Sequence, residues 1–273
     1  MFCLSSPQDF LAESLAKLYS GLTFIPLGPE GAPADGIDTL GFDSLEFPLT
    51  NSKTSSARVL WRPPIYELPS PALGARVNYE EEEWRAYWSG LLAAWPGDVM
   101  NRPDPRRVLS GFDRTAYGHD LIRSAGLRVP DIIVSSNSQF FLKSQHDCYR
   151  LRSSRGQTSV ASRDGLGEEL VNMLAHGPVS ALCHPEGNQV TATVVGERCI
   201  YHSPPPSGLE KLTESLRVLC QGLHLNLLTI DLIWVSQDEV YVVAANEYPY
   251  LYPQKLRHSD LAAISAIKDW LSV

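Results

Sequence analysis

Several histidines stand next to cysteines or aspartates in this sequence, and these residue types bind metals or form nucleophiles. His146, Asp147 and Cys148 are consecutive, but ligands at adjacent positions rarely converge on one ion, so a polar loop is the favoured interpretation. Cys183 and His184 are also adjacent, and a Cys/His nucleophile pair could be drawn from them. No spacing among the seven histidines selects such a pair. The histidines therefore predict no specific metal or nucleophile site.

The common local motifs of enzymes give no stronger indication. The sequence contains no GxSxG, GxGxxG, P-loop or HExxH pattern. The order of the expected helices and strands is more informative than any single motif, so the elements that would position a site are considered next.

Composition bounds the class of protein. The chain has 273 residues, 44% hydrophobic residues and a formal charge of −8, which indicates a folded protein of about two domains and argues against a general nucleic-acid binder. No window of about 18 apolar residues occurs, so we expect no membrane span. The start has no pattern of a signal peptide. The five cysteines form no CxxC pair, which favours reduced thiols and a cytoplasmic location.

The first part of the chain predicts a small β-α-β unit followed by a long helix. In residues 79–95 the aromatic and leucine side chains recur at three- and four-residue steps, and four glutamates stand at the amino end, where the helix dipole favours them. This acidic run is interpreted as a solvated face rather than a docking patch for a basic peptide. The expected elements are a helix at 10–18 ending before Gly21, strands at 22–27 and 58–62, and the helix at 79–95.

The second part predicts mixed helices and strands. Gly196 and Glu197 are expected to form the turn of a β-hairpin, and Ser259 is expected to be the N-cap of the last helix. Residues 144–162 show no apolar period and are expected to be irregular. The expected helices are 108–125, 166–175, 209–220 and 260–271, and the expected strands are 127–135, 140–143, 179–183, 189–195, 198–202, 227–235 and 240–244.

Five sequence blocks, in this order, carry a resemblance to a known family. They are residues 59–63 (VLWRP), 101–103 (NRP), 124–130 (SAGLRVP), 195–197 (VGE), and the stretch from Gly222-Leu223 through Asp231 that closes at Asn246. On these blocks the sequence resembles the ATP-grasp family, and within it the microviridin-type (graspetide) peptide ligases. The resemblance implies an α/β (α+β) fold: a truncated ATP-grasp-like fold with a pre-grasp open-sheet domain at residues 1–96 and a reduced ATP-grasp-like domain at 97–273.

The departures from the family lie where the resemblance places nucleotide chemistry. Lys143 matches a nucleotide-binding lysine, and Asp231 and Asn246 match two Mg²⁺ ligands, but the position of the metal-binding glutamate is Ala244. The phosphate-binding arginine corresponds to Thr191, an early lysine corresponds to Thr115, and residues 144–147 replace a glycine-containing phosphate loop. We therefore expect no cofactor. The alternative is weakened binding of ATP and Mg²⁺, with Glu247 as a replacement ligand.

The resemblance also implies a partner. Graspetide-type ligases recognise the leader of a precursor peptide with a β-hairpin and a neighbouring helix, which here correspond to residues 190–201 and 209–220. Arg198, Tyr201 and Arg217 are the candidate peptide-binding residues. The expected function is leader-peptide binding in the biosynthesis of a ribosomally synthesised and modified peptide, with a crocagin-type pathway as one setting.

Several alternatives stay open at this point. The chain could only present the peptide or could also catalyse a step. It could instead be a divergent, active ATP-dependent ligase that forms ester or amide cross-links. A third reading is a structural partner that forms a homo- or heterodimer with a related protein, for which the tryptophan-rich helix could provide an interface.

Overall fold

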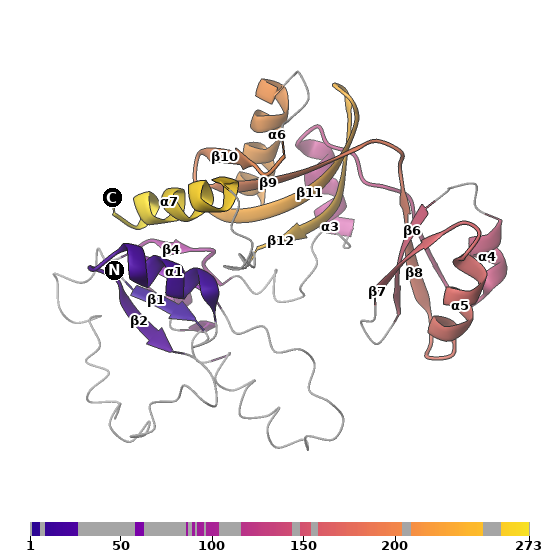
Figure 1. Cartoon of the computed structure of the whole chain (residues 1–273), viewed down its shortest axis with the longest axis horizontal. Coiled ribbons are helices and arrows are strands. Elements are labelled where there is room, and N and C mark those ends of the chain that lie inside the picture. Colours follow the sequence, from indigo (N-terminus) through magenta and orange to yellow (C-terminus); the bar gives the residue numbers. More distant parts are fainter. Residues whose placement is uncertain are drawn as a thin grey trace, which may run out of the picture.

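A computed structural model describes residues 2–5, 9–26, 58–62, 86, 89–90, 92–95, 97–103, 116–143, 148–153, 158–203, 209–247 and 258–272. The chain forms three four-stranded sheets, which we name A, B and C. Sheet A contains β1 to β4, sheet B contains β9 to β12, and sheet C contains β5 to β8. Figure 1 shows sheet A beside sheet B with helix α7 between them, and sheet C at the other end of the molecule. Within the described residues, no helix is both long and apolar enough to span a membrane.

Sheet A is parallel and contains the amino-terminal residues. Its strands lie in the order β2-β1-β3-β4. Asp9 begins the first helix, because its Oδ1 accepts hydrogen bonds from the backbone N–H groups of Leu11 and Ala12. The expected β-α-β unit is thus confirmed. The elements are β1 (Phe2–Ser5), α1 (Phe10–Leu18), β2 (Thr23–Pro26), β3 (Val59–Trp61) and β4 (Val99–Met100).

The fourth strand of sheet A lies beyond the expected domain boundary. Strand β4 pairs with β3, with Val59 opposite Val99 and Leu60 opposite Met100. The division into residues 1–96 and 97–273 stays a proposal, and the pairing of β4 places the end of sheet A at Met100.

Sheet B is antiparallel, with strands in the order β10-β9-β11-β12. The expected hairpin turn is confirmed: Gly196 has φ +56°, a backbone conformation that glycine adopts without strain. Helices α3 and α6 pack against one face of the sheet in its main apolar core, and α7 packs against the other face. The elements are α3 (Ala116–Ser124), β9 (Asn188–Val195), β10 (Arg198–Tyr201), α6 (Leu209–Gly222), β11 (Leu227–Ser236), β12 (Glu239–Asn246) and α7 (His258–Ser272).

Sheet C is antiparallel, with strands in the order β5-β8-β6-β7, and it has an apolar core of its own. Both of its helices cover the same face, and Figure 1 shows them on the side away from the rest of the molecule. The elements are β5 (Ile132–Ser135), α4 (Ser138–Leu142), β6 (Cys148–Ser153), β7 (Thr158–Ser162), α5 (Leu166–Leu174) and β8 (Val179–His184).

Two predictions in this sheet were wrong. The strand expected at 140–143 is the end of helix α4, which begins at the N-cap Asn137 and buries Phe141. The irregular segment expected at 144–162 contains strands β6 and β7. Strand β6 buries Tyr149, Leu151 and Ser153 at alternate positions, but only two of these three are apolar, so the period is short in the sequence.

Smaller differences concern the ends of elements. Of the strand expected at 127–135, only Ile132–Ser135 belongs to sheet C. Arg128 instead lies along β12, where its N–H donates to the carbonyl of Val240 and its carbonyl accepts from Val242. Ser259 is not the N-cap of α7, because the helix already includes His258. Of the tryptophan-rich helix, residues 86, 89–90 and 92–93 are helical, and the rest of 79–91 lies outside the described residues.

Candidate functional site

Two rows of side chains cross one face of sheet B. Asp231 lies opposite Thr191 on one neighbouring strand and Ala244 on the other, and Thr229 lies opposite Thr193 and Asn246 in the same way. Because directly paired and alternate residues share a face, the two rows lie side by side. We call this surface the threonine face. It brings together the predicted metal ligands Asp231 and Asn246.

Hydrogen bonds on the threonine face run between its own residues. Thr191 Oγ1 donates to Asp231 Oδ1 at 2.8 Å. Thr193 is buried, and its Oγ1 lies 2.7 Å from Thr229 Oγ1 and 2.7 Å from His202 Nε2. These polar side chains therefore satisfy one another inside the fold.

His202 extends this network to helix α7. Its Nδ1 lies 3.1 Å from Ser259 Oγ and 3.1 Å from Asp260 Oδ1, and its side chain is only 8% exposed. Sequence reasoning missed this histidine as a functional residue, because its partners are 9, 57 and 58 positions away in the chain. The network holds the first turn of α7 against sheet B.

The described residues supply only part of the expected Mg²⁺–ATP site. Mg²⁺ is usually bound through one or two carboxylates together with substrate phosphates, and the position opposite Asp231 is alanine. No group of three His, Cys, Asp or Glu side chains in the described part of the chain could hold a metal ion. Lys143 is exposed at the C-cap of α4 in sheet C, and residues 144–147 lie outside the described residues.

The hairpin and α6 form a second polar group on the opposite face of sheet B. The Tyr201 hydroxyl lies 3.0 Å from Thr213 Oγ1 on α6, and Arg217 Nε donates to the carbonyl of Glu197 at 2.9 Å. Burial raises the pKa of Tyr201 and of Cys199, which stands on the same side of β10, so both groups are neutral at pH 7. Two of the three predicted peptide-binding residues, Tyr201 and Arg217, thus belong to one surface.

The third residue, Arg198, lies on the other face of sheet B. It pairs with Asp269 of α7 at 2.6 Å, and both side chains are about half exposed. Residues three positions apart in a strand point to opposite faces, so Arg198 and Tyr201 cannot converge on one short ligand segment. The spacing of three positions between Arg198 and Tyr201 already indicates in the sequence that the two side chains lie on opposite faces.

A polar cleft of about 440 Å³ opens at the end of the hairpin and α6. Arg217, Glu197 and Gln221 line it together with Asp98 and His224. Of the three predicted peptide-binding residues, only Arg217 contributes to its wall. The cleft, the hairpin and α6 form a continuous surface that a peptide segment could occupy.

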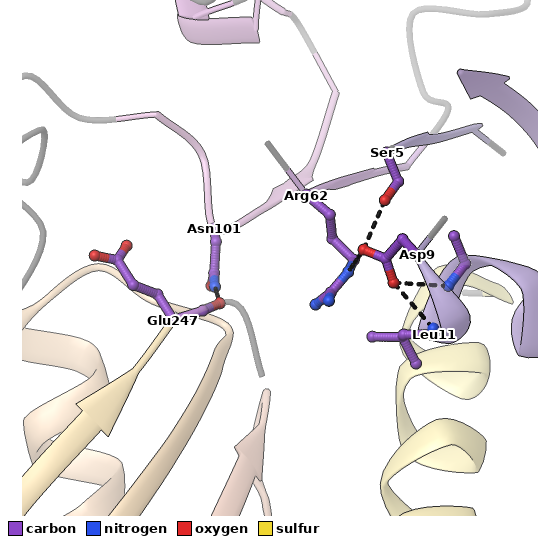
Figure 2. Close-up of polar contacts among 7 residues, drawn as sticks. Ser5, Asp9, Leu11, Arg62, Asn101 and Glu247 are labelled. Carbon is purple, nitrogen blue, oxygen red and sulfur yellow. Dashed lines mark hydrogen bonds and ion pairs between the residues drawn. The ribbon is translucent and has the colours of Figure 1, made fainter. Parts of the chain in front are cut away.

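Asn101 fixes the position of sheet B relative to sheet A. It is buried, and its Nδ2 donates to the carbonyls of Leu227 at 2.7 Å and Glu247 at 2.6 Å. Its Oδ1 accepts from the N–H groups of Asn226 and Leu227. Figure 2 shows Asn101 against the Glu247 backbone, with the Glu247 carboxylate pointing away from it. One amide side chain thus connects β4 with the start of β11 and the end of β12.

A comparable contact organises sheet A. Arg62, which directly follows β3, donates from Nε to Asp9 Oδ2 at 2.5 Å, and Ser5 Oγ donates to the same oxygen at 2.7 Å (Figure 2). Asp9 therefore joins the N-cap of α1 to two strands of the sheet.

Comparison with solved structures identifies the architecture. The structure is similar to macrocyclase MdnC bound with precursor peptide MdnA from Microcystis aeruginosa, with a TM-score of 0.67, 16% identity, and coverage of 100% of this chain and 99% of that chain. It is also similar to the RiPP-associated ATP-grasp ligase of Chryseobacterium gregarium in complex with ADP and a leader and core peptide, with a TM-score of 0.62, 16% identity, and 99% and 96% coverage. The chain has an ATP-grasp fold.

A third similar structure is the ATP-grasp ligase PsnB complexed with a minimal precursor, with a TM-score of 0.64, 14% identity, and coverage of 97% of this chain and 98% of that chain. No protein-family model and no curated protein matches the sequence. The ATP-grasp fold expected from the five sequence blocks is confirmed. The expected replacement of the phosphate loop at residues 144–147 lies outside the described residues.

Proposed function

We propose that this ATP-grasp-fold protein binds the precursor peptide of a ribosomally synthesised and modified peptide, and that it does so without ATP-dependent ligase activity. The bound segment lies on the surface formed by hairpin β9–β10, helix α6 and the cleft beside them. Tyr201 and Arg217 contact the peptide directly. Arg198 acts from the other face by holding the hairpin to α7.

One observation carries this proposal: the two polar surfaces of sheet B differ in what they offer a ligand. On the threonine face, Asp231 is engaged by Thr191 and faces Ala244. On the α6 side, a cleft of about 440 Å³ combines hydrogen-bonding groups with a partly exposed guanidinium, Arg217. Peptide recognition uses such polar clefts, and Tyr201, which contacts Thr213 one turn of α6 before Arg217, supplies an aromatic contact on the adjoining surface.

The comparisons support the choice of ligand. The structure of MdnC is a complex with precursor peptide MdnA, and that of the Chryseobacterium ligase contains a leader and a core peptide. A crocagin-type pathway, a cytoplasmic location and pairing with a related protein are finer parts of the same proposal.

Calorimetric titration with the precursor peptide encoded beside this gene tests the proposal. We expect saturable binding to the wild-type chain and about tenfold weaker binding to Arg217→Gln, because a charge-assisted hydrogen bond to the peptide is lost. Arg123→Gln is the matched control, since Arg123 is an exposed arginine on α3 that pairs only locally with Asp120. Absence of heat with the wild-type chain, or equal affinity of both variants, contradicts the proposal.

A divergent, active ligase is the second candidate, because Asp231 and Asn246 do share the threonine face. The similar PsnB structures include a complex with minimal precursor, Mg and ADP. Thermal unfolding with and without Mg²⁺–ATP separates the candidates, because a ligand that binds only the folded state raises the melting temperature. We expect no shift. A shift of several degrees that Asp231→Asn abolishes would establish the second candidate.

A further inference from the structure

Sheet C ends at a strand that has a neighbour on one side only. In the order β5-β8-β6-β7, strand β7 pairs with β6 from Cys148 opposite Ser162 to Arg152 opposite Thr158, and no other strand of the described residues pairs with it. In an antiparallel strand, each residue directs its N–H and C=O groups to the same side, and successive residues alternate. Every second residue of β7 therefore directs its backbone groups away from β6. We call this row of backbone groups the β7 edge.

The edge strands of the other two sheets carry features that oppose pairing with a further strand. Natural sheets protect their edges with short strands, proline, charged side chains or a covering segment. In sheet A, β2 ends in Pro26 and β4 has only two residues. In sheet B, β10 begins with Arg198, and the backbone of Arg128 is hydrogen-bonded along the outer side of β12, to Val240 and Val242.

The β7 edge has none of these features. Its sequence, TSVAS, contains no proline and no charged residue, and its pairing with β6 continues over all five residues without a bulge. Val160, at the centre of the strand, is 64% exposed. An uncharged edge of this kind, with a β-branched residue at its centre, is suited to pairing with a strand of another chain.

The length of β7 favours a second copy of the same strand as its partner. Directly opposite residues of an antiparallel pair lie on the same face, whereas successive residues alternate between faces. A two-fold axis between two copies of one strand must therefore place a residue opposite its own copy. With the axis at Val160, all five residues of β7 obtain a partner, since Ser159 lies opposite Ala161 and Thr158 opposite Ser162. Strand β5, the other edge of sheet C, is also uncharged, but at most three of its four residues can pair in this way.

We propose that two copies of this chain associate through their β7 edges, antiparallel and about a two-fold axis at Val160. The two C sheets then form one continuous sheet, and helices α4 and α5 of both copies lie on the same face of it, because the axis is perpendicular to the sheet. The interface uses the same surface of both copies, so it closes as a dimer and does not continue as a fibre. The inference rests on the pairing with a related protein that the proposed function includes, and it names the surface and the partner.

Sedimentation equilibrium of the full chain across the micromolar range tests the association. One pair of five-residue strands is a small interface, so we expect a monomer–dimer equilibrium that depends on concentration. Val160→Lys places two like charges directly opposite each other at the axis and should weaken dimerisation by about tenfold or more. Raising the salt concentration should restore part of the dimerisation of this variant, because salt screens the repulsion.

Val171→Lys is the matched control, because Val171 is a similarly exposed valine, 69% exposed, on helix α5 of the same sheet. It should dimerise like the wild type, and circular dichroism shows whether both variants are folded. A wild-type chain that stays monomeric overturns the inference, and so does a Val160→Lys chain that dimerises as strongly as the wild type. Assemblies that grow beyond a dimer also contradict it, since they indicate a head-to-tail contact.

A cysteine at the axis tests the register of the two strands. In Val160→Cys the two introduced residues lie directly opposite each other, with Cα atoms about 4.5–5.5 Å apart, a separation that a disulfide can span. With oxidised glutathione as the oxidant, Val160→Cys should form a covalent dimer on a non-reducing gel, whereas Val171→Cys and the wild type should not. Equal cross-linking of the two variants would exclude the proposed axis.

Titration with the precursor peptide keeps this inference separate from the proposed function. We expect Val160→Lys to bind the peptide in the same Arg217-dependent way as the wild type, because the cleft beside α6 belongs to sheet B. If the wild-type chain binds the peptide but stays monomeric, only the inference about the β7 edge is lost. If it dimerises through β7 but binds no peptide, the dimer is retained and the proposed peptide binding is lost.

Discussion

Sheets B and C are both four-stranded and antiparallel, yet they use their polar faces in opposite ways. The threonine face of sheet B is closed by its own hydrogen bonds, from Asp231 to Thr191 and from Thr193 to Thr229 and His202. On sheet C, Arg150 and Arg152 of β6 lie on the face that α4 and α5 leave uncovered, and no ion pair among the described residues involves them. The difference teaches that polar residues in equivalent sheets can either complete a fold or remain available to a ligand.

The two sheets also differ in how they are attached. Sheet B is joined to sheet A by the buried Asn101 and to α7 by His202. A further link is Arg58 next to β3, which donates to the carbonyl of Trp270 and stacks over its ring at 4.9 Å. Sheet C has a separate apolar core and connects to the body through the chain that leads into β5 and out of β8. Stability and ligand binding should therefore respond to different sets of mutations.

The largest effect is expected for Asn101→Ala, which should lower the free energy of unfolding by about 4 kcal/mol, because it leaves several buried backbone groups without partners. Asn137→Ala is the matched change in sheet C. It removes one exposed N-cap hydrogen bond, to Gln139 N–H, and should cost only about 1 kcal/mol. Urea unfolding followed by circular dichroism gives both values.

Asn101→Gly separates the two contributions at this position. Asn101 has φ +55°, which glycine adopts freely and alanine does not. We expect Asn101→Gly to be almost as unstable as Asn101→Ala, because the lost hydrogen bonds dominate. Recovery of most of the stability by glycine would show that backbone strain, rather than the connection between sheets, determines the loss.

The next prediction tests whether a second carboxylate would create a Mg²⁺ site on the threonine face. Ala244→Glu places a second carboxylate directly opposite Asp231, and this like-charge pair should destabilise the fold by about 1 kcal/mol in the absence of divalent cations. Mg²⁺ should then restore the lost stability, since Asn246 adds an oxygen ligand on the same face. Thermal unfolding with Mg²⁺ and with EDTA measures this response.

Ala244→Gln is the control for this variant, because it adds similar volume without charge and should not respond to Mg²⁺. If Ala244→Glu is equally insensitive to Mg²⁺, the missing glutamate is not what prevents metal binding. The hydrogen bond from Thr191 to Asp231 would then be the next feature to remove.

The sequence predicted elements well where a period of two or 3.6 residues coincided with a turn signal. Gly196 marked the β9–β10 hairpin, and the apolar residues of α6 marked a helix that packs on sheet B. Strand β6 was missed although Arg150 and Arg152 alternate with buried positions, because only Tyr149 and Leu151 of these positions are apolar and the run is therefore short. Helix α4 was missed because its five residues are too few to show a helical period.

The candidate site was predictable only in part. The resemblance named Asp231 and Asn246 together, and the strand register places both on the threonine face. The opposite directions of Arg198 and Tyr201 were also contained in their spacing of three. The contacts of His202 with Asp260 and of Asn101 with Leu227 depend on tertiary packing, since 58 and 126 positions separate the partners. No local pattern reports such contacts.

The smallest effect concerns thiol reactivity, which compares the two sheets without a mutation. Cys148 and Cys199 are partly exposed, on sheets C and B, whereas Cys220 is buried. Burial raises the pKa of Cys199, and it raises the pKa of Cys220 to about 12. Because the thiolate is the reactive form, a higher pKa means less reaction near neutral pH.

We therefore expect iodoacetamide to label Cys148 first, Cys199 more slowly and Cys220 last, as measured by mass spectrometry after brief exposure at pH 8. Cys148 lies on the same face of sheet C as Arg150 and Arg152, because it stands two positions before Arg150 in the same strand. Equal labelling rates of Cys148 and Cys199 would contradict this order and would mean that burial does not distinguish the partly exposed thiols of the two sheets.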